Sequence, residues 1–294
     1  MVRGYDASYQ FEGRFFARPE HAPIVWMGDN RRDWLGLSDA MDHLFRSAAA
    51  GYVVVGTDIG GYLDRDDQQL TQVVPADVEV FNRWTAMGAL NPFMQLHGRA
   101  NLAPWTVEER AEETTANYRY WSHVHEAMIP FFYSLAEEAY AGGENLLRPL
   151  GTEASWQGDY RYMLGDAMLV APILDETLVR NVILPEAGPW HDWWKPIESP
   201  VAGQTLMDVS LPDSREIPVY IKAGAIIPMR SLAEDVGLGP TDVPSLHFYP
   251  ADAGSRFVWH HADGETVEVE WVVDDAGRRL VLSRVPEDLQ LRVW

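Results

Sequence analysis

The chain has 294 residues, of which 47% are hydrophobic and 12% aromatic, and this is enough for one large core or two smaller ones. Its 44 acidic and 23 basic residues give a formal net charge of −21, which repels phosphate and anionic lipid. We therefore expect a neutral substrate and no nucleic acid or membrane partner. There are no cysteines, which excludes disulfides and thiolate metal sites.

The first twenty residues show no clear hydrophobic period and contain Gly4, Gly13 and Pro19, so we expect them to be a connecting segment. They hold no basic stretch followed by an apolar one, and no apolar run in the chain approaches the thickness of a bilayer. Neither a signal peptide nor a membrane span is therefore expected. The sequence leaves the location unknown, with the cytoplasm favoured.

The first strong signal is the apolar run of residues 24–27, which ends in Gly28-Asp29-Asn30. Such a run predicts a buried parallel strand, and α/β sheets and barrels keep their chemistry at the carboxyl ends of such strands. Asp29 is therefore the leading catalytic candidate. The alternative is a plain turn in which Asp29 caps the following helix, and these residues alone favour that alternative.

The alternation of strand and helix then continues along the chain. The predicted elements are a helix from the N-cap Ser38 to Gly51, a strand over 52–55 that leads into Asp58, a helix from Pro75, a strand over 92–97 that ends in His97, and a long helix over 106–141 broken or kinked at Pro130. A whole (β/α)8 barrel takes ~250 residues. We therefore expect residues 1–142 to be the C-terminal portion of such a barrel.

Beyond Gly142-Gly143 the pattern changes to strand runs separated by turn residues. An antiparallel β-sandwich is predicted for residues 143–232, and residues 233–294 add strands to it or form a distal β domain. In this last part Asp263-Gly264 and Ala276-Gly277 are predicted as hairpin turns. The expected fold class is thus α/β plus all-β, the C-terminal part of a barrel followed by antiparallel β-sandwich domains.

Asp29, Asp58 and His97 end three successive predicted strands. Because the carboxyl ends of barrel strands share one mouth, these side chains are expected to converge on one pocket. Side chains that suit a sugar, through ring faces and charged hydrogen-bonding groups, occur around them: Trp26, Tyr62, Arg83, Trp84 and Trp105. For Trp84 and Trp105 taken singly, a place in the core is the favoured interpretation.

Several motifs follow one another in a fixed order. They are Trp26-Met27-Gly28-Asp29-Asn30, Asp58-Ile59-Gly60-Gly61-Tyr62, Arg83-Trp84, Pro92-Phe93-Met94-Gln95-Leu96-His97, Arg148-Pro149-Leu150, Val170-Ala171-Pro172 and Ile217-Pro218-Val219. In order and spacing this set resembles glycoside hydrolase family 31, the α-glucosidases and α-xylosidases. The likeness covers roughly residues 14 to 230 and is weaker in the tail.

The resemblance implies a role for each matching residue. Asp29 matches the family's general acid/base, Asp58 a residue that contacts substrate or buttresses the pocket, His97 a histidine that binds sugar hydroxyls, Arg83 a pocket arginine, and Trp26 an aromatic wall. Tyr62 and Trp84 complete the predicted substrate-binding set. Gln95 departs from the arginine that many members have there. No cofactor and no metal ligand are implied.

The family's nucleophilic aspartate lies well before the acid/base motif, and nothing in the 28 residues before Asp29 matches it. Retaining glycosidases need two carboxyl groups about 5–5.5 Å apart, and Asp29, kept protonated by aromatic surroundings, would supply one. The resemblance thus implies a retaining α-glycosidase acting on terminal α-linked glucosyl or xylosyl residues of an oligosaccharide or α-glycoside. The chain would be an inactive C-terminal fragment, completed by an N-terminal half or associated with a second copy.

Two other functions are weighed against this one. The first is a non-catalytic carbohydrate-binding or regulatory homologue that has lost the nucleophile. The second is a metal-dependent hydrolase using Asp29, Asp58 and His97, which is the least favoured because the chain has no closely spaced histidine pair.

Overall fold

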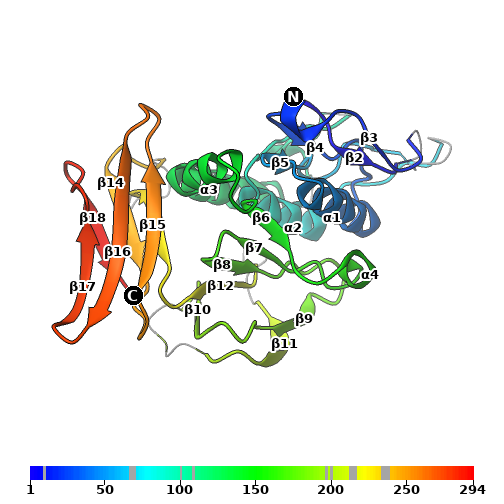
Figure 1. Cartoon of the computed structure of the whole chain (residues 1–294). Coiled ribbons are helices and arrows are strands. Elements are labelled where there is room, and N and C mark those ends of the chain that lie inside the picture. Colours follow the sequence, from blue (N-terminus) through cyan, green and yellow to red (C-terminus); the bar gives the residue numbers. More distant parts are fainter. Residues whose placement is uncertain are drawn as a thin grey trace.

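In the computed structural model of the chain, the described residues are 1–8, 11–65, 71–99, 101–107, 110–195, 198, 201–211, 217–232 and 239–294. Figure 1 shows three groups of elements: short parallel strands with long helices, an antiparallel sheet below them, and a separate group of strands at the C-terminal end. No helix within these ranges is both long and apolar enough to cross a membrane.

The N-terminal part is built on three short parallel strands in the order β1-β4-β5. They are β1 (Val2–Arg3), β4 (Val25–Trp26) and β5 (Val55–Gly56). A parallel bridge between Asp58 and Gln95 continues the sheet beyond β5. The parallel strands thus follow the same order in the sheet as along the chain. This is the strand order of a (β/α)8 barrel and confirms the predicted fold class.

The described part of the first twenty residues contains more regular structure than predicted. Besides β1 they contain the antiparallel pair β2 (Tyr5–Asp6) and β3 (Arg14–Phe15) and the short helix η1 (Pro19–His21). Strands of two residues are too short to show a hydrophobic period, so the sequence pattern misses them. The strand predicted over 92–97 does not form; within it, only Gln95 makes a β-bridge.

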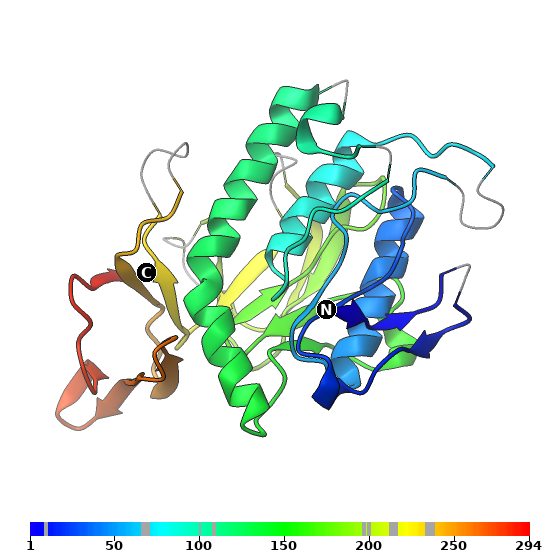
Figure 2. The ribbon, with the colours of Figure 1, turned by 90° about the horizontal axis from the view of Figure 1, so that it is seen from above.

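A helix follows β4, β5 and the bridge at Gln95 in turn. These helices are α1 (Trp34–Ala49), α2 (Val78–Ala89) and α3 (Ala111–Tyr140), which lie side by side in Figure 2. α1 begins before the predicted Ser38, because Asp33 is the N-cap and accepts a hydrogen bond from Gly36 N at 2.8 Å. α3 runs through Pro130 as one continuous helix.

The second part is an antiparallel five-stranded sheet in the order β10-β12-β8-β7-β6, with a separate β11-β9 pair. Its elements are β6 (Leu147–Pro149), α4 (Glu153–Trp156), β7 (Tyr162–Leu164), β8 (Met168–Val170), β9 (Val179–Ile183), β10 (Trp190–Asp192), β11 (Thr205–Ser210) and β12 (Val219–Lys222). Gly224, at φ +92°, turns the chain between β12 and the next strand, β13 (Ile226–Arg230).

The C-terminal part consists of two three-stranded sheets, β13-β14-β18 and β15-β16-β17. The strands are β13 (Ile226–Arg230), β14 (Pro244–Phe248), β15 (Ser255–His260), β16 (Thr266–Asp274), β17 (Gly277–Leu282) and β18 (Gln290–Val293). Both predicted hairpins are present; the first turn contains Asp263-Gly264, whereas the second is Asp275-Ala276, one residue before the predicted pair. The β14–β18 pair is parallel, unlike the antiparallel pairing predicted throughout. The boundaries at 142 and 232 stay predictions.

α3 joins these parts, because it packs on α2 and also on β13 and β15. His260 N donates a hydrogen bond to Ser134 Oγ at 3.0 Å, and His260 Nε2 lies 2.6 Å from Glu138 Oε1. The Phe131 ring stacks on Phe257, with the ring centroids 5.7 Å apart. One helix therefore carries the barrel helices on one side and the C-terminal strands on another.

Candidate active site

Asp29 follows β4 through a turn that requires glycine. Gly28 has φ +76°, and a Cβ there would lie 1.9 Å from Asp6 Oδ2, so any other residue would collide with that carboxylate. The turn leaves the Asp29 side chain 22% exposed beyond the end of the strand. The predicted position at the carboxyl end of a parallel strand is thus confirmed.

Arg3, on the neighbouring strand β1, holds the Asp29 carboxylate. Its Nη2 donates a hydrogen bond to Asp29 Oδ1 at 3.0 Å, and its Nη1 lies 2.5 Å from Oδ2 of the fully buried Asp6. Arg3 is the register partner of Trp26, and its guanidinium lies over the Trp26 ring at 5.0 Å from the centroid. The ion pair stabilises a negative charge on Asp29.

The surroundings of Asp29 are therefore not the purely aromatic ones expected from the sequence. Arg3 and Asp6 add a cation and a second carboxylate, and sequence reasoning missed both. Arg3 lies 26 positions before Asp29, in a segment without a hydrophobic period. Only knowledge that this segment forms the adjacent strand would have indicated the pair.

Asp58, beyond the end of β5, is fully buried. Gln95 Nε2 donates a hydrogen bond to Asp58 Oδ1, and Oδ2 has no hydrogen-bond partner within the described ranges. Burial raises the pKa of Asp58 to about 7; the Gln95 hydrogen bond and the Arg3 charge oppose this rise, and the Asp29 charge adds to it. The structure thus brings Asp29 and Asp58 into one electrostatic environment, as the strand ends predicted.

Tyr62 and His97 come from the loops that follow β5 and the bridge at Gln95. Their ring centroids are 5.1 Å apart with the ring planes tilted by 31°. His97 is exposed and Tyr62 half-buried, so both rings are accessible from solvent. A backbone hydrogen bond from Arg99 N to Tyr62 O at 2.9 Å ties the two loops together. This pair presents the ring faces and polar atoms that a sugar contact requires.

Arg83 and Trp84, both on α2, are buried, with 4% and 0% of their surfaces exposed. Trp84 Nε1 donates a hydrogen bond to Thr57 Oγ1 at 2.8 Å, next to Asp58 in the chain. Neither side chain presents a face to solvent, so their predicted contact with a sugar is corrected to a supporting position beneath the strand ends. The helical pattern alone cannot tell these two positions apart.

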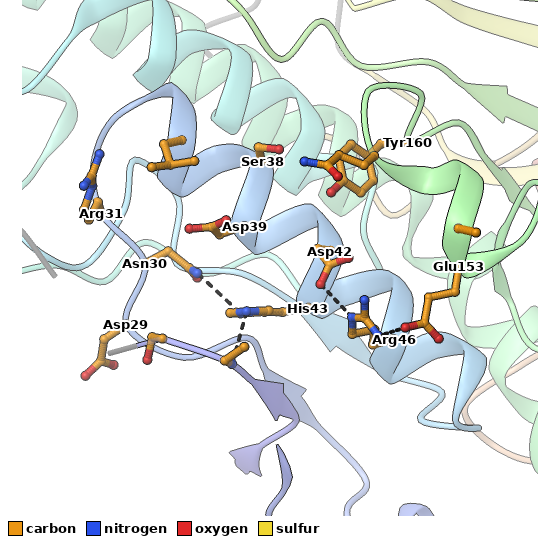
Figure 3. A pocket seen from close by; sticks show the side chains of 15 residues that line it. Asp29, Asn30, Arg31, Ser38, Asp39, Asp42, His43, Arg46, Glu153 and Tyr160 are labelled. Carbon is orange, nitrogen blue, oxygen red and sulfur yellow. Dashed lines mark hydrogen bonds and ion pairs between the residues drawn. The ribbon is translucent and has the colours of Figure 1, made fainter. Parts of the chain in front are cut away.

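A hollow of about 680 Å³ lies between α1 and α4 (Figure 3). Of the predicted site residues only Asp29 lines it, so it is not the predicted mouth. Arg46 crosses it, with Nε 2.7 Å from Asp42 Oδ2 and with Nη1 paired to Glu153. In Figure 3 the Asp29 side chain lies apart from this ion-pair group.

The described groups can carry out proton exchange with a neutral, hydroxyl-rich ligand. Asp29 is accessible and paired with a cation, whereas Asp58 is buried and about half protonated near pH 7. Across the ranges that the structure describes, no three His, Cys, Asp or Glu side chains are grouped so as to hold a metal ion. The chemistry available to Asp29 and Asp58 is thus that of carboxyl groups acting as acid or base.

Two family models match this chain. The model of the glycosyl hydrolases family 31 TIM-barrel domain matches residues 11–135, and that of the family 31 C-terminal domain matches residues 143–227. An alpha-xylosidase of Saccharolobus solfataricus is 27% identical over 263 residues, which are 87% of this chain and 34% of that protein. Alpha-glucosidase 2 of Bacillus thermoamyloliquefaciens is 26% identical over 264 residues, 87% of this chain and 31% of its own.

Solved structures share the fold. The cycloalternan-forming enzyme of Listeria monocytogenes, solved in complex with a pentasaccharide substrate, has a TM-score of 0.71 and 24% identity over 85% of this chain and 25% of its own. The GH31 alpha-xylosidase of Xanthomonas citri has a TM-score of 0.69 and 21% identity over 92% of this chain and 32% of its own. The chain spans about a third of the length of the two curated relatives described above.

Proposed function

The chain belongs to glycoside hydrolase family 31, and we propose that it supplies the acid/base side of a retaining α-glycosidase that releases terminal α-linked glucosyl or xylosyl residues. The observation that supports this best is the position of Asp29. It lies beyond a barrel-type strand, accessible to solvent, paired with Arg3 and electrostatically coupled to Asp58. The exposed His97 ring and the half-buried Tyr62 ring supply a surface for the sugar.

In the proposed reaction a carboxylate attacks the anomeric carbon while protonated Asp29 gives its proton to the glycosidic oxygen. The bond to the leaving group breaks, and the leaving group departs as an alcohol. Asp29, now a carboxylate stabilised by Arg3, then takes a proton from water as the water oxygen attacks the same carbon. The sugar–carboxylate bond breaks, and both groups return to their initial states.

The attacking carboxylate is assigned to no residue of this chain. Asp58 is fully buried, and its Oδ1 accepts a hydrogen bond from Gln95. We therefore propose that an N-terminal half of the same enzyme supplies it. Mixing the chain with a separately expressed upstream segment should give activity, and a parallel sedimentation measurement distinguishes a hetero-complex from a homo-oligomer.

The test of Asp29 is the variant Asp29→Asn in the protein that carries the activity. Turnover of α-glycosides with poor leaving groups should fall sharply, whereas substrates with good leaving groups, which need no proton, should be affected less. Asp39→Asn, which changes a carboxyl on α1 in the neighbouring hollow, is the matched control. Small and equal effects of Asp29→Asn on both substrate types would refute the assignment.

The burial of Asp58 is also what a non-catalytic carbohydrate-binding homologue would show, because Asp29 is then the one accessible carboxyl among the predicted site residues. Sugar binding without turnover, even with the upstream segment supplied, would support that function. A cytoplasmic location is likewise a proposal, and fractionation of expressing cells tests it.

A further inference from the structure

Trp105 is placed unlike the other tryptophans of this chain. The chain has twelve tryptophans, and the other eleven are buried or half-buried, whereas Trp105 is 67% exposed. An indole is a large apolar surface that proteins usually bury, and an exposed one is enriched where a ligand covers it. Exposure alone is not evidence of a site, so the support and the surroundings of the ring decide the matter.

The segment that carries Trp105 is firmly anchored. Trp105 is the middle residue of the helix η2 (Pro104–Thr106), with the buried residues Pro104 before it and Val107 after it. Ala103 N donates a hydrogen bond to Thr106 Oγ1 at 2.8 Å, and the Thr114 hydroxyl donates one to Pro104 O. These contacts fix the backbone of the segment that carries the exposed indole.

A hollow of about 330 Å³ lies against Trp105 on the first turns of α3. Its small side chains, Ala111 and Ala116, leave room beside the ring, and its polar ones are Glu112, Thr115 and Arg119. Positions 112, 115, 116 and 119 share one face of a helix, because they are three or four residues apart. The hollow thus combines an aromatic wall with a carboxylate, a hydroxyl and a guanidinium.

The polar groups of this hollow are unused. Within the part of the chain that the structure describes, neither Glu112 nor Arg119 makes an ion pair or a side-chain hydrogen bond. Arg110, close by, is fully engaged, with Nη1 2.7 Å from Glu79 Oε1 and Nη2 2.5 Å from Glu113 Oε1. In a chain whose acidic residues outnumber its basic ones, an arginine left unpaired beside an unpaired glutamate is available to a ligand.

We propose that Trp105, Glu112 and Arg119 form a second carbohydrate-binding site, which takes a glucosyl unit of an α-glucan chain. The C–H face of the sugar stacks on the indole, Glu112 accepts from one hydroxyl, and Arg119 donates to another. One negative and one positive group balance, which suits a neutral ligand. The choice of an α-glucan rests on the proposed function; the presence of a site rests on the geometry.

The site lies at the same end of the molecule as the candidate active site. Trp105 is in the connection that follows His97 and precedes α3, and the three helices run side by side from this end (Figure 2). In a barrel these connections all lie at the carboxyl ends of the strands.

The experiment follows the indole N–H signal of Trp105 in the ¹⁵N-labelled chain while maltotetraose is added, and measures retardation of the chain in gels containing soluble starch. We expect the signal to move saturably, and Trp105→Ala to weaken starch retention about fivefold to tenfold. Trp105→Phe should retain part of the affinity, and the double variant Glu112→Gln, Arg119→Gln should lose most of it. Tyr140→Ala, which removes an exposed ring at the other end of α3, is the control and should bind as the parent.

A second control separates this site from the proposed active site. His97→Ala should leave the movement of the Trp105 signal unchanged, so failure at one site is not read as failure at the other. The proposal is overturned if the Trp105 signal stays fixed at saturating maltotetraose or if Trp105→Ala, folded by circular dichroism, is retarded as the parent is. A signal that moves only with protein concentration would identify a surface between copies and would also overturn it.

Discussion

Arg3 Nη2 lies 3.0 Å from Asp29 Oδ1, and the same guanidinium neutralises the buried Asp6. Replacing Arg3 by glutamine would leave Asp6 as an uncompensated buried charge, so we expect the free energy of unfolding to fall by about 3–5 kcal/mol. Adding Asp6→Asn removes that charge and should restore more than half of the loss. Urea unfolding of the single and double variants measures this; an equal loss in both would contradict it.

Gly28→Ala should destabilise the chain by about 3 kcal/mol, because it adds a clash with Asp6 to an unfavourable backbone angle. Gly264→Ala is the matched control, since Gly264 has a similar φ of +86° but nothing within 4 Å of an added Cβ. The control should cost only about 1 kcal/mol, the backbone part alone. Thermal or urea unfolding measures both, and equal costs would show that Asp6 does not restrict position 28.

The pKa of Asp58 is raised to about 7 from an ordinary value of 3.8, mainly by burial. The folded state therefore binds this proton more tightly than the unfolded state. The stability that this provides is complete below about pH 4 and is lost as the pH rises through 7, a change on the order of 4 kcal/mol. Asp58→Asn should flatten the stability curve between these values, whereas the exposed Asp252→Asn should not. An unaltered pH profile in Asp58→Asn would contradict the burial account.

His97→Ala should weaken the binding of glucose or xylose to the chain about tenfold, since it removes an exposed ring and its polar atoms next to Tyr62. Saturation-transfer difference NMR measures the affinity. His21→Ala, which removes an exposed histidine on η1, serves as the comparison. If the two variants bind sugar equally well, the Tyr62–His97 pair is not the sugar surface.

Dialysis against EDTA should change neither sugar binding nor the melting temperature, because the described ranges present no group of metal-ligating side chains. Loss of binding that a divalent ion restores would favour the metal-dependent alternative. The assay is the NMR affinity measurement repeated before and after dialysis.

The sequence predicted the features that depend on local pattern. These include the position of Asp29 after a strand, the approximate extent of α3 and both C-terminal hairpins. It failed where the outcome depends on distant segments. β1 is visible only through its pairing with β4, and that pairing is what brings Arg3 to Asp29.

The burial of Arg83 and Trp84 on α2 could not be predicted from the sequence either. Arg83 and Trp84 belong to a helix that is enclosed on several sides, and the sequence pattern cannot say which neighbours enclose it. The motif resemblance was specific enough to give the family, but it could not separate residues that touch a ligand from those that support them.

The position of α3 links the unfolding of the barrel part to that of the C-terminal strands. Its first turns carry Glu112 and Arg119, while its last turns are bound to β15 through Ser134 and Glu138. Melting of the C-terminal strands would therefore release one end of the helix on which the barrel helices pack. Heat should unfold the chain in a single cooperative transition. A destabilising substitution in β15 should therefore lower the melting temperature of the whole chain, the barrel helices included.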